Sequence, residues 1–126
     1  GEHTDYGLLT VVNQDEEHTA LQVKNASGHW IDAEPVPGAF VCNIGDCLAL
    51  LSNGMYQSTL HRVVHDGSGA DARISVPYFH EPDFDAVITP MTELVTSERP
   101  LVPHERLVYG EHLQSKVRSN FELNRA

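Results

Sequence analysis

Short runs of apolar and β-branched residues, separated by polar turn residues, fill the first two-thirds of the chain. The runs fall at residues 8–12, 21–24, 29–32, 39–44, 47–51, 60–64 and 73–79. Asn, Asp, Ser, Gly and Pro cluster between them, as at residues 25–28 and 66–71, and such clusters form turns and loops. Short strands in regular succession are typical of an all-β sandwich or barrel and exclude a parallel α/β sheet.

The last third of the chain has a different pattern. Residues 83–100 are irregular and are interrupted by prolines. Tyr109, Leu113, Val117 and Phe121 then recur at every fourth position, which predicts one helix over residues 109–121. We expect this helix to pack on the outside of the β-core, and we divide the chain into residues 1–90 and a C-terminal extension, residues 91–126.

The charge balance excludes two classes of partner. Lys and Arg number 8 and Asp and Glu 18, which gives a formal net charge of −10. Nucleic acids and anionic membranes both need a positive surface, so neither is expected as a partner. No apolar run approaches the ~18 residues of a membrane helix, and residues 1–5 show no signal peptide.

Cys42 and Cys47 are expected to be buried free thiols in a reducing cytosol.

Eight histidines direct attention to metal or proton chemistry. His3 and Asp5 are two positions apart, so in an extended chain they share a face, and His61 lies on a separate predicted strand. Two imidazoles and one carboxylate can hold Fe(II) on one face of an octahedron and leave three positions open. Taken alone, His3 and Asp5 could equally be a surface pair on an edge strand.

A second pair follows on the last predicted strand. Arg73 and Ser75 share a face, and a guanidinium beside a hydroxyl is a natural receptor for a carboxylate. Taken alone, Arg73 could instead pair with an acidic side chain at the surface. Phe79 is an even number of positions from Arg73 and Ser75 on the same predicted strand, so it is expected on the same face.

The other histidines are predicted to be solvated or at a loop edge: His18, His29, His65, His80, His104 and His112.

Six ordered segments resemble one known family. They are residues 3–7 (HTDYG), 21–23 (LQV), 37–46 (PGAFVCNIGD), 52–54 (SNG), 58–63 (STLHRV) and 73–75 (RIS). Together they resemble the C-terminal catalytic region of the Fe(II)/2-oxoglutarate-dependent dioxygenases, closest to the isopenicillin N synthase-like branch. The resemblance runs from residue 1 to about residue 90, and residues 109–113 (YGEHL) are similar to the trailing helix of the family.

The resemblance implies a double-stranded β-helix, which is a jelly-roll barrel, with the helix packed outside. It implies His3, Asp5 and His61 as iron ligands, Arg73 with Ser75 as the receptor for 2-oxoglutarate, and Phe79 in the substrate pocket. The implied activity couples oxidative decarboxylation of 2-oxoglutarate to hydroxylation or a related oxidation of a small organic substrate by dioxygen.

Members of this family carry an additional N-terminal part that contributes to the site. We therefore expect this chain to be part of a larger cytoplasmic enzyme, inactive and poorly soluble without that part. Three alternatives stay open at this point. They are an isopenicillin N synthase-like Fe(II) oxidase that does not use 2-oxoglutarate, a non-catalytic carboxylate-binding barrel, and a zinc-dependent hydrolase with the same ligands.

Overall fold

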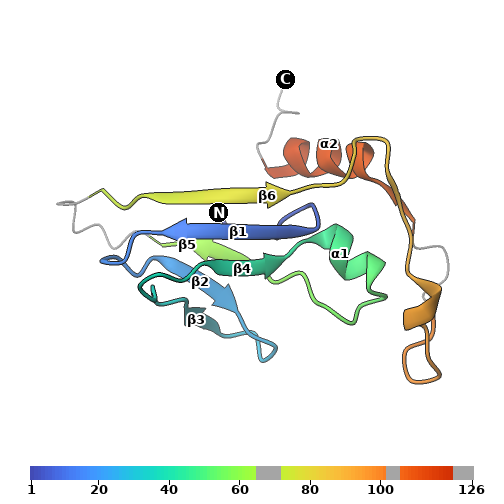
Figure 1. The fold of residues 1–126 in the computed structure, drawn as a ribbon, viewed down its shortest axis with the longest axis horizontal. Helices are drawn as coiled ribbons and strands as arrows, with labels where there is room; N and C mark the ends of the chain where they lie inside the picture. Colours follow the sequence, from blue (N-terminus) through green and yellow to red (C-terminus); the bar gives the residue numbers. More distant parts are fainter. Residues whose placement is uncertain (65–71, 102–105, 121–126) are drawn as a thin grey trace.

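The computed structural model describes residues 1–64, 72–101 and 106–120 of the 126-residue chain. Within these ranges short strands dominate the N-terminal part, and the longest helix lies near the C-terminus (Figure 1). The elements, in chain order, are β1 (Leu9–Gln14), β2 (Leu21–Lys24), β3 (Trp30–Asp32), β4 (Val41–Ile44), α1 (Asp46–Leu51), β5 (His61–Val63), β6 (Ser75–His80), β7 (Val87–Ile88), the 3-10 helix η1 (Thr92–Leu94), β8 (Leu107–Val108) and α2 (Tyr109–Asn120).

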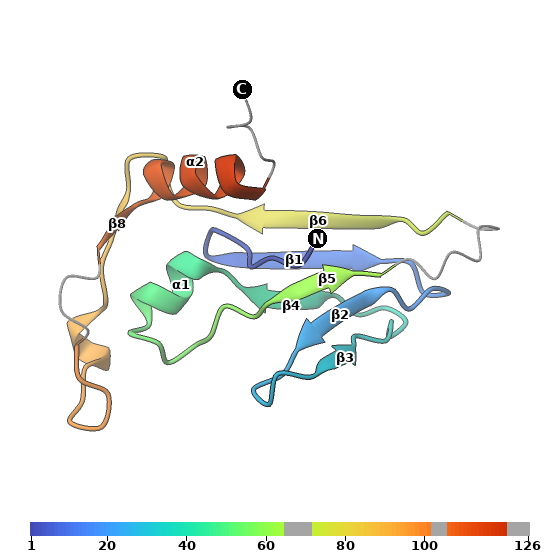
Figure 2. The ribbon, with the colours of Figure 1, turned by 180° about the vertical axis from the view of Figure 1, so that it is seen from behind.

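Two three-stranded antiparallel sheets form the β-core, with strand orders β4-β1-β6 and β3-β2-β5. In Figure 1 β5 lies behind β1 and β4, and in the reverse view of Figure 2 it lies in front of them. Thr10 and Val12 of β1 and Leu21 and Val23 of β2 line one shared cavity. Because side chains alternate along a strand, these residues mark the inner faces of the two sheets. The predicted β-rich core is confirmed.

The N-terminal segment is fixed between the second sheet and α1. His3 and His61 exchange backbone hydrogen bonds, each with an N···O distance of 2.9 Å. On the other side, the Asp46 N–H donates to the Asp5 carbonyl at 2.8 Å, and the Cys47 N–H donates to the Gly7 carbonyl at 3.0 Å. Residues far apart in the sequence therefore meet around residues 3–7.

The strand predicted at residues 47–51 is wrong, because Asp46–Leu51 forms helix α1. Gly45, the N-cap residue, has extended backbone angles of φ −91° and ψ 170°. Leu and Ala, which fill most of the helix, are strong helix formers. The prediction failed because a short continuous apolar run has no periodicity that distinguishes a strand from a helix.

A small apolar core lies where α1, β7 and α2 meet. Cys47, Ile88 and Tyr109 are buried there, and Leu113 packs against them. The Tyr109 hydroxyl donates to Glu81, and burial, reinforced by that carboxylate, raises the pKa of Tyr109. The helix predicted at residues 109–121 is confirmed over Tyr109–Asn120, and Phe121 lies outside the described residues. The ranges described contain no helix with the length and apolar character needed to cross a membrane.

The two cysteines have different environments, although both are free. Cys47 is buried, as predicted, and its side chain has no exposed surface. The prediction that Cys42 is buried is wrong. Val41 and Asn43, its neighbours on β4, line the inner cavity, so strand alternation turns Cys42 to the exposed outer face.

Candidate metal and carboxylate site

His3, Asp5 and His61 come together at one end of the inner cavity. One donor atom from each side chain lies within 4.8 Å of the other two. Asp5 Oδ1 is 3.7 Å from His3 Nε2 and 3.5 Å from His61 Nε2. Asp5 is buried, and the two imidazoles are partly buried. The three residues selected from the sequence therefore form one cluster.

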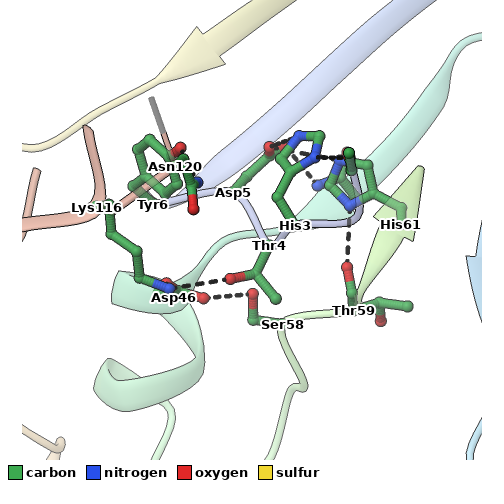
Figure 3. A network of polar contacts seen from close by, with 12 residues as sticks. His3, Thr4, Asp5, Tyr6, Asp46, Ser58, Thr59, His61, Lys116 and Asn120 are labelled. Carbon is green, nitrogen blue, oxygen red and sulfur yellow. Dashed lines mark hydrogen bonds and ion pairs between the residues drawn. The ribbon is translucent and has the colours of Figure 1, made fainter. Parts of the chain in front are cut away.

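Neighbouring groups orient each of these three side chains. His3 Nδ1 lies 3.1 Å from the Gly1 carbonyl, and His61 Nδ1 lies 3.0 Å from the Thr59 carbonyl. A carbonyl only accepts, so in each of these hydrogen bonds Nδ1 carries the hydrogen and a neutral ring keeps its lone pair on Nε2. Figure 3 shows His61 above Thr59 and both rings beside Asp5.

Asp5 is oriented by Asn43, which the sequence analysis did not select. Asn43 Nδ2 donates to Asp5 Oδ2 at 2.6 Å, and the other carboxylate oxygen stays beside the two imidazoles. Its strand position could have identified it. Asn43 shares the inward face of β4 with Val41, where a polar side chain needs a partner.

Two Nε2 atoms and one carboxylate oxygen that face a common point suit a divalent metal ion. Held from one side only, such an ion keeps open coordination positions, as in the two-His-one-carboxylate sites of non-haem iron oxygenases. Zinc accepts the same three ligand types, so the donor set alone does not select between the metals. Supporting hydrogen bonds like those of Asn43 and the two carbonyls are also typical of metal-binding side chains.

Arg73 lies in the same cavity, which has a volume of about 170 Å³. Its guanidinium donates to Ser75 Oγ and to Gln14 Oε1, each at 3.3 Å. Arg73 Nε is buried and has no partner among the described residues. A buried donor without an acceptor is costly, so this nitrogen predicts an acceptor in the cavity, and a carboxylate matches the guanidinium best.

Gln14 is a second residue that the sequence analysis missed. Like Thr10 and Val12, Gln14 is at a position of β1 whose side chain faces inward. Its side-chain amide donates to the Ala33 carbonyl at 3.3 Å, and its side-chain oxygen accepts from Arg73. Gln14 thus links β1 to the chain after β3 and fixes the position of Arg73.

The strand register separates the two ends of the cavity. Ser75 pairs with Gln14, whereas Phe79 pairs with Thr10, and Thr10 also pairs with Asn43. Phe79 therefore lies toward the end that holds Asp5, and Arg73 lies toward the other end. Phe79 lines the cavity, and about half of its surface is exposed (49%).

The remaining histidines were predicted to be solvated or at a loop edge, and only some of those described are exposed. The prediction is wrong for His112, which lies 3.1 Å from Asp46 Oδ2 and is partly buried. His18 is also partly buried, 3.1 Å from Asp15 Oδ1. His29 and His80 are exposed as predicted. His65 and His104 lie outside the described residues.

Comparison with known proteins places this chain in a family. The model of the 2OG-Fe(II) oxygenase superfamily matches residues 1–82. A homoarginine-6-hydroxylase from Glycine max is 54% identical over 121 residues, which are 96% of this chain and 36% of the relative.

Solved structures agree with the family match. A full-length Neurospora crassa protein in complex with alpha-KG and thymine has a TM-score of 0.80 at 36% identity, over 95% of this chain and 37% of that one. The dioxygenase for auxin oxidation in rice has a TM-score of 0.79 at 30% identity, over 95% of this chain and 40% of that one.

The chain belongs to the 2OG-Fe(II) oxygenase superfamily. It spans about a third of the length of the curated relatives that it matches.

Proposed function

We propose that this chain is the catalytic region of an Fe(II)- and 2-oxoglutarate-dependent oxygenase. His3, Asp5 and His61 would hold the iron, and Arg73 with Ser75 would bind the distal carboxylate of 2-oxoglutarate. One observation carries the proposal. A two-His-one-carboxylate cluster and a buried guanidinium nitrogen without a partner among the described residues line the same cavity.

When bound, iron and 2-oxoglutarate supply the oxidation of a substrate C–H bond by dioxygen, coupled to loss of carbon dioxide and formation of succinate. The residues of the chain contribute orientation and a dry site. Arg73 would fix one end of an elongated dicarboxylate. Asn43 holds one Asp5 oxygen, so the other would be free to bind the metal. Val12, Leu21 and Val23 give the cavity an apolar wall, which would limit the access of water to the reacting groups once a substrate fills it.

The finer features of fold and organisation belong to the same proposal. The two facing antiparallel sheets and the likeness to solved oxygenases support a jelly-roll barrel. Residues 1–90 would be the catalytic region and residues 91–126 the extension, completed by an N-terminal part of the same enzyme. The two free thiols support a cytosolic location.

The relatives suggest which substrate to test first. Four curated relatives that are 49–54% identical are named homoarginine-6-hydroxylases. We therefore propose a small molecule of the homoarginine type as substrate, with Phe79 on the wall of its pocket.

The test is succinate formation by the intact protein, meaning this chain together with the N-terminal part of the same enzyme. The assay contains Fe(II), 2-oxoglutarate, dioxygen and homoarginine. We expect homoarginine to increase succinate formation and to yield a product heavier by one oxygen atom. Arg73→Met should strongly reduce both at 2-oxoglutarate concentrations near the wild-type Kd. Arg62→Met is the matched control, because Arg62 stacks on Trp30, 4.1 Å from the ring centroid, and does not line the cavity.

Two of the alternatives give their own results in this assay. Oxidised product without added 2-oxoglutarate would indicate the cosubstrate-free oxidase. Hydrolysis with zinc and no succinate would indicate the hydrolase. If iron and 2-oxoglutarate bind but neither homoarginine nor related amino acids stimulate turnover, the proposed substrate class is wrong.

A further inference from the structure

One polar face of α2 is directed toward the segment that carries two of the proposed metal ligands. His112, Lys116 and Asn120 are four residues apart and so lie on one side of the helix. His112 contacts Asp46, Lys116 contacts Asp46 and Thr4, and Asn120 Nδ2 donates to the Tyr6 hydroxyl at 2.6 Å.

Asp46 is the centre of these contacts. Its Oδ2 lies 2.8 Å from Lys116 Nζ and 3.1 Å from His112 Nε2, and its Oδ1 accepts from Ser58 Oγ at 2.7 Å. Burial raises the pKa of Asp46, but the hydrogen bonds from Lys116 and Ser58 outweigh that effect and hold the pKa below its ordinary value. The Asp46 carboxylate is therefore ionised at neutral pH and firmly held.

From this centre two short connections lead to the metal ligands. Lys116 Nζ donates to Thr4 Oγ1 at 3.2 Å, and Thr4 lies between His3 and Asp5 in the sequence. The Asp46 backbone N–H donates to the Asp5 carbonyl at 2.8 Å. Figure 3 shows Lys116 reaching Asp46 and Thr4 on the side opposite to the imidazoles of His3 and His61.

We propose that helix α2 holds the metal-binding segment in place, with Lys116 as a positioning residue that acts through Asp46 and Thr4. This inference rests on the proposed function, since it assumes that His3 and Asp5 bind the metal. The backbone bridge to β5 and the contacts with α1 and Asn43 also help to fix the segment. The C-terminal extension is then part of the support of the site and does more than cover the β-core.

The test is the affinity of the intact protein for Co(II), a stand-in for Fe(II) that resists oxidation and whose visible absorption reports ligand geometry. We compare the wild type with Lys116→Met, which keeps the length of the side chain and removes its charge. Arg118→Met is the matched control, since Arg118 is an exposed cation on the same helix. Thermal unfolding is recorded for every variant.

We expect Lys116→Met to weaken Co(II) binding about tenfold, the usual effect of losing a group that supports a metal ligand, and to change the Co(II) absorption. Arg118→Met should leave both unchanged. Thr4→Val removes the hydroxyl that accepts from Lys116 and that also hydrogen-bonds to Asp46. Thr4→Val should weaken Co(II) binding as well. The loss of binding free energy in the double variant, Lys116→Met with Thr4→Val, should be smaller than the sum of the two single losses, because the two residues share one contact.

The possible outcomes separate this inference from the proposed function. If Lys116→Met and Thr4→Val bind Co(II) with wild-type affinity and absorption, even with a lower melting temperature, Lys116 is only a stabilising residue and the inference is wrong. If Lys116→Met does not fold, Thr4→Val alone decides. If the wild type and His61→Ala bind Co(II) equally, the metal site itself is wrong, and this inference falls with it.

Discussion

Replacing Arg73 tests the carboxylate end of the cavity. Arg73→Met keeps an unbranched apolar chain and removes the guanidinium, including the buried Nε that has no partner among the described residues. Because Arg73 touches none of the three proposed metal ligands, we expect 2-oxoglutarate binding to weaken while metal binding is retained.

The size of the loss follows from the contacts. A carboxylate can accept from the free Nε and from a second guanidinium nitrogen, and each charge-assisted hydrogen bond contributes roughly 1.5–3 kcal/mol. Two such bonds give about 3–6 kcal/mol, and each ~1.4 kcal/mol is a factor of ten in Kd. Arg73 is only partly buried, so water competes for the ligand and the lower end applies. We expect Kd to rise about 100-fold.

The assay is an anaerobic titration of the iron-loaded intact protein with 2-oxoglutarate, followed by the weak visible charge-transfer band that forms when both bind at one centre. Arg73→Lys should give an intermediate Kd, because it keeps the charge but loses the two-pronged geometry. Arg62→Met should match the wild type. A change of about threefold or less in Kd is smaller than the effect of one charge-assisted hydrogen bond. If the Kd of Arg73→Met for 2-oxoglutarate stays within about threefold of the wild-type value, Arg73 does not bind the carboxylate.

Three further changes test the surroundings of the site. Asn43→Ala leaves Asp5 Oδ2 buried without its donor and should lower the free energy of unfolding of the metal-free protein by about 1–3 kcal/mol, measured with urea. Gly45→Ala would push a Cβ into the Gly7 carbonyl oxygen; it should lower the free energy of unfolding by about 1–3 kcal/mol, measured by thermal unfolding. Iodoacetamide at about pH 9 should label exposed Cys42 and spare Cys47, whose pKa burial raises to about 11, as peptide mass spectrometry can show.

The controls for these changes come from the same chain. Asn13→Ala, at an exposed position on β1, should leave the free energy of unfolding unchanged. Gly1→Ala meets no atom within 4 Å and should be neutral. An Asn43→Ala variant as stable as Asn13→Ala, or a Gly45→Ala variant that melts like the wild type, would contradict the contacts described. Equal labelling rates for the two thiols would contradict the burial of Cys47.

The strands and the proposed ligands were predictable because alternation and spacing carry that information. His3 and Asp5, and likewise Arg73 and Ser75, share a face through period-two geometry, and both pairs line the cavity. His61 was a candidate on a separate predicted strand, and the family resemblance gave it the role of a third ligand, since no local pattern connects it to residues 3–5. It joins them through the backbone bridge between His3 and His61.

Two features needed the structure because they depend on partners that are remote in the sequence. The run at residues 47–51 carries no periodicity, and it forms a helix whose first residues are held by the Asp5 and Gly7 carbonyls. Lys116 lies on the face of α2 away from its apolar stripe, which is typical of a solvated residue. The approach of Asp46 partly buries that face.

The most direct test of the central claim is the stoichiometry and affinity of Co(II) binding to the intact protein, measured by calorimetry without oxygen. We expect one ion per chain and no measurable binding at this site in His61→Ala. His29→Ala, which removes an exposed histidine, should bind like the wild type. Retention of the full wild-type affinity by His61→Ala would contradict the claim that His3, Asp5 and His61 hold one metal ion.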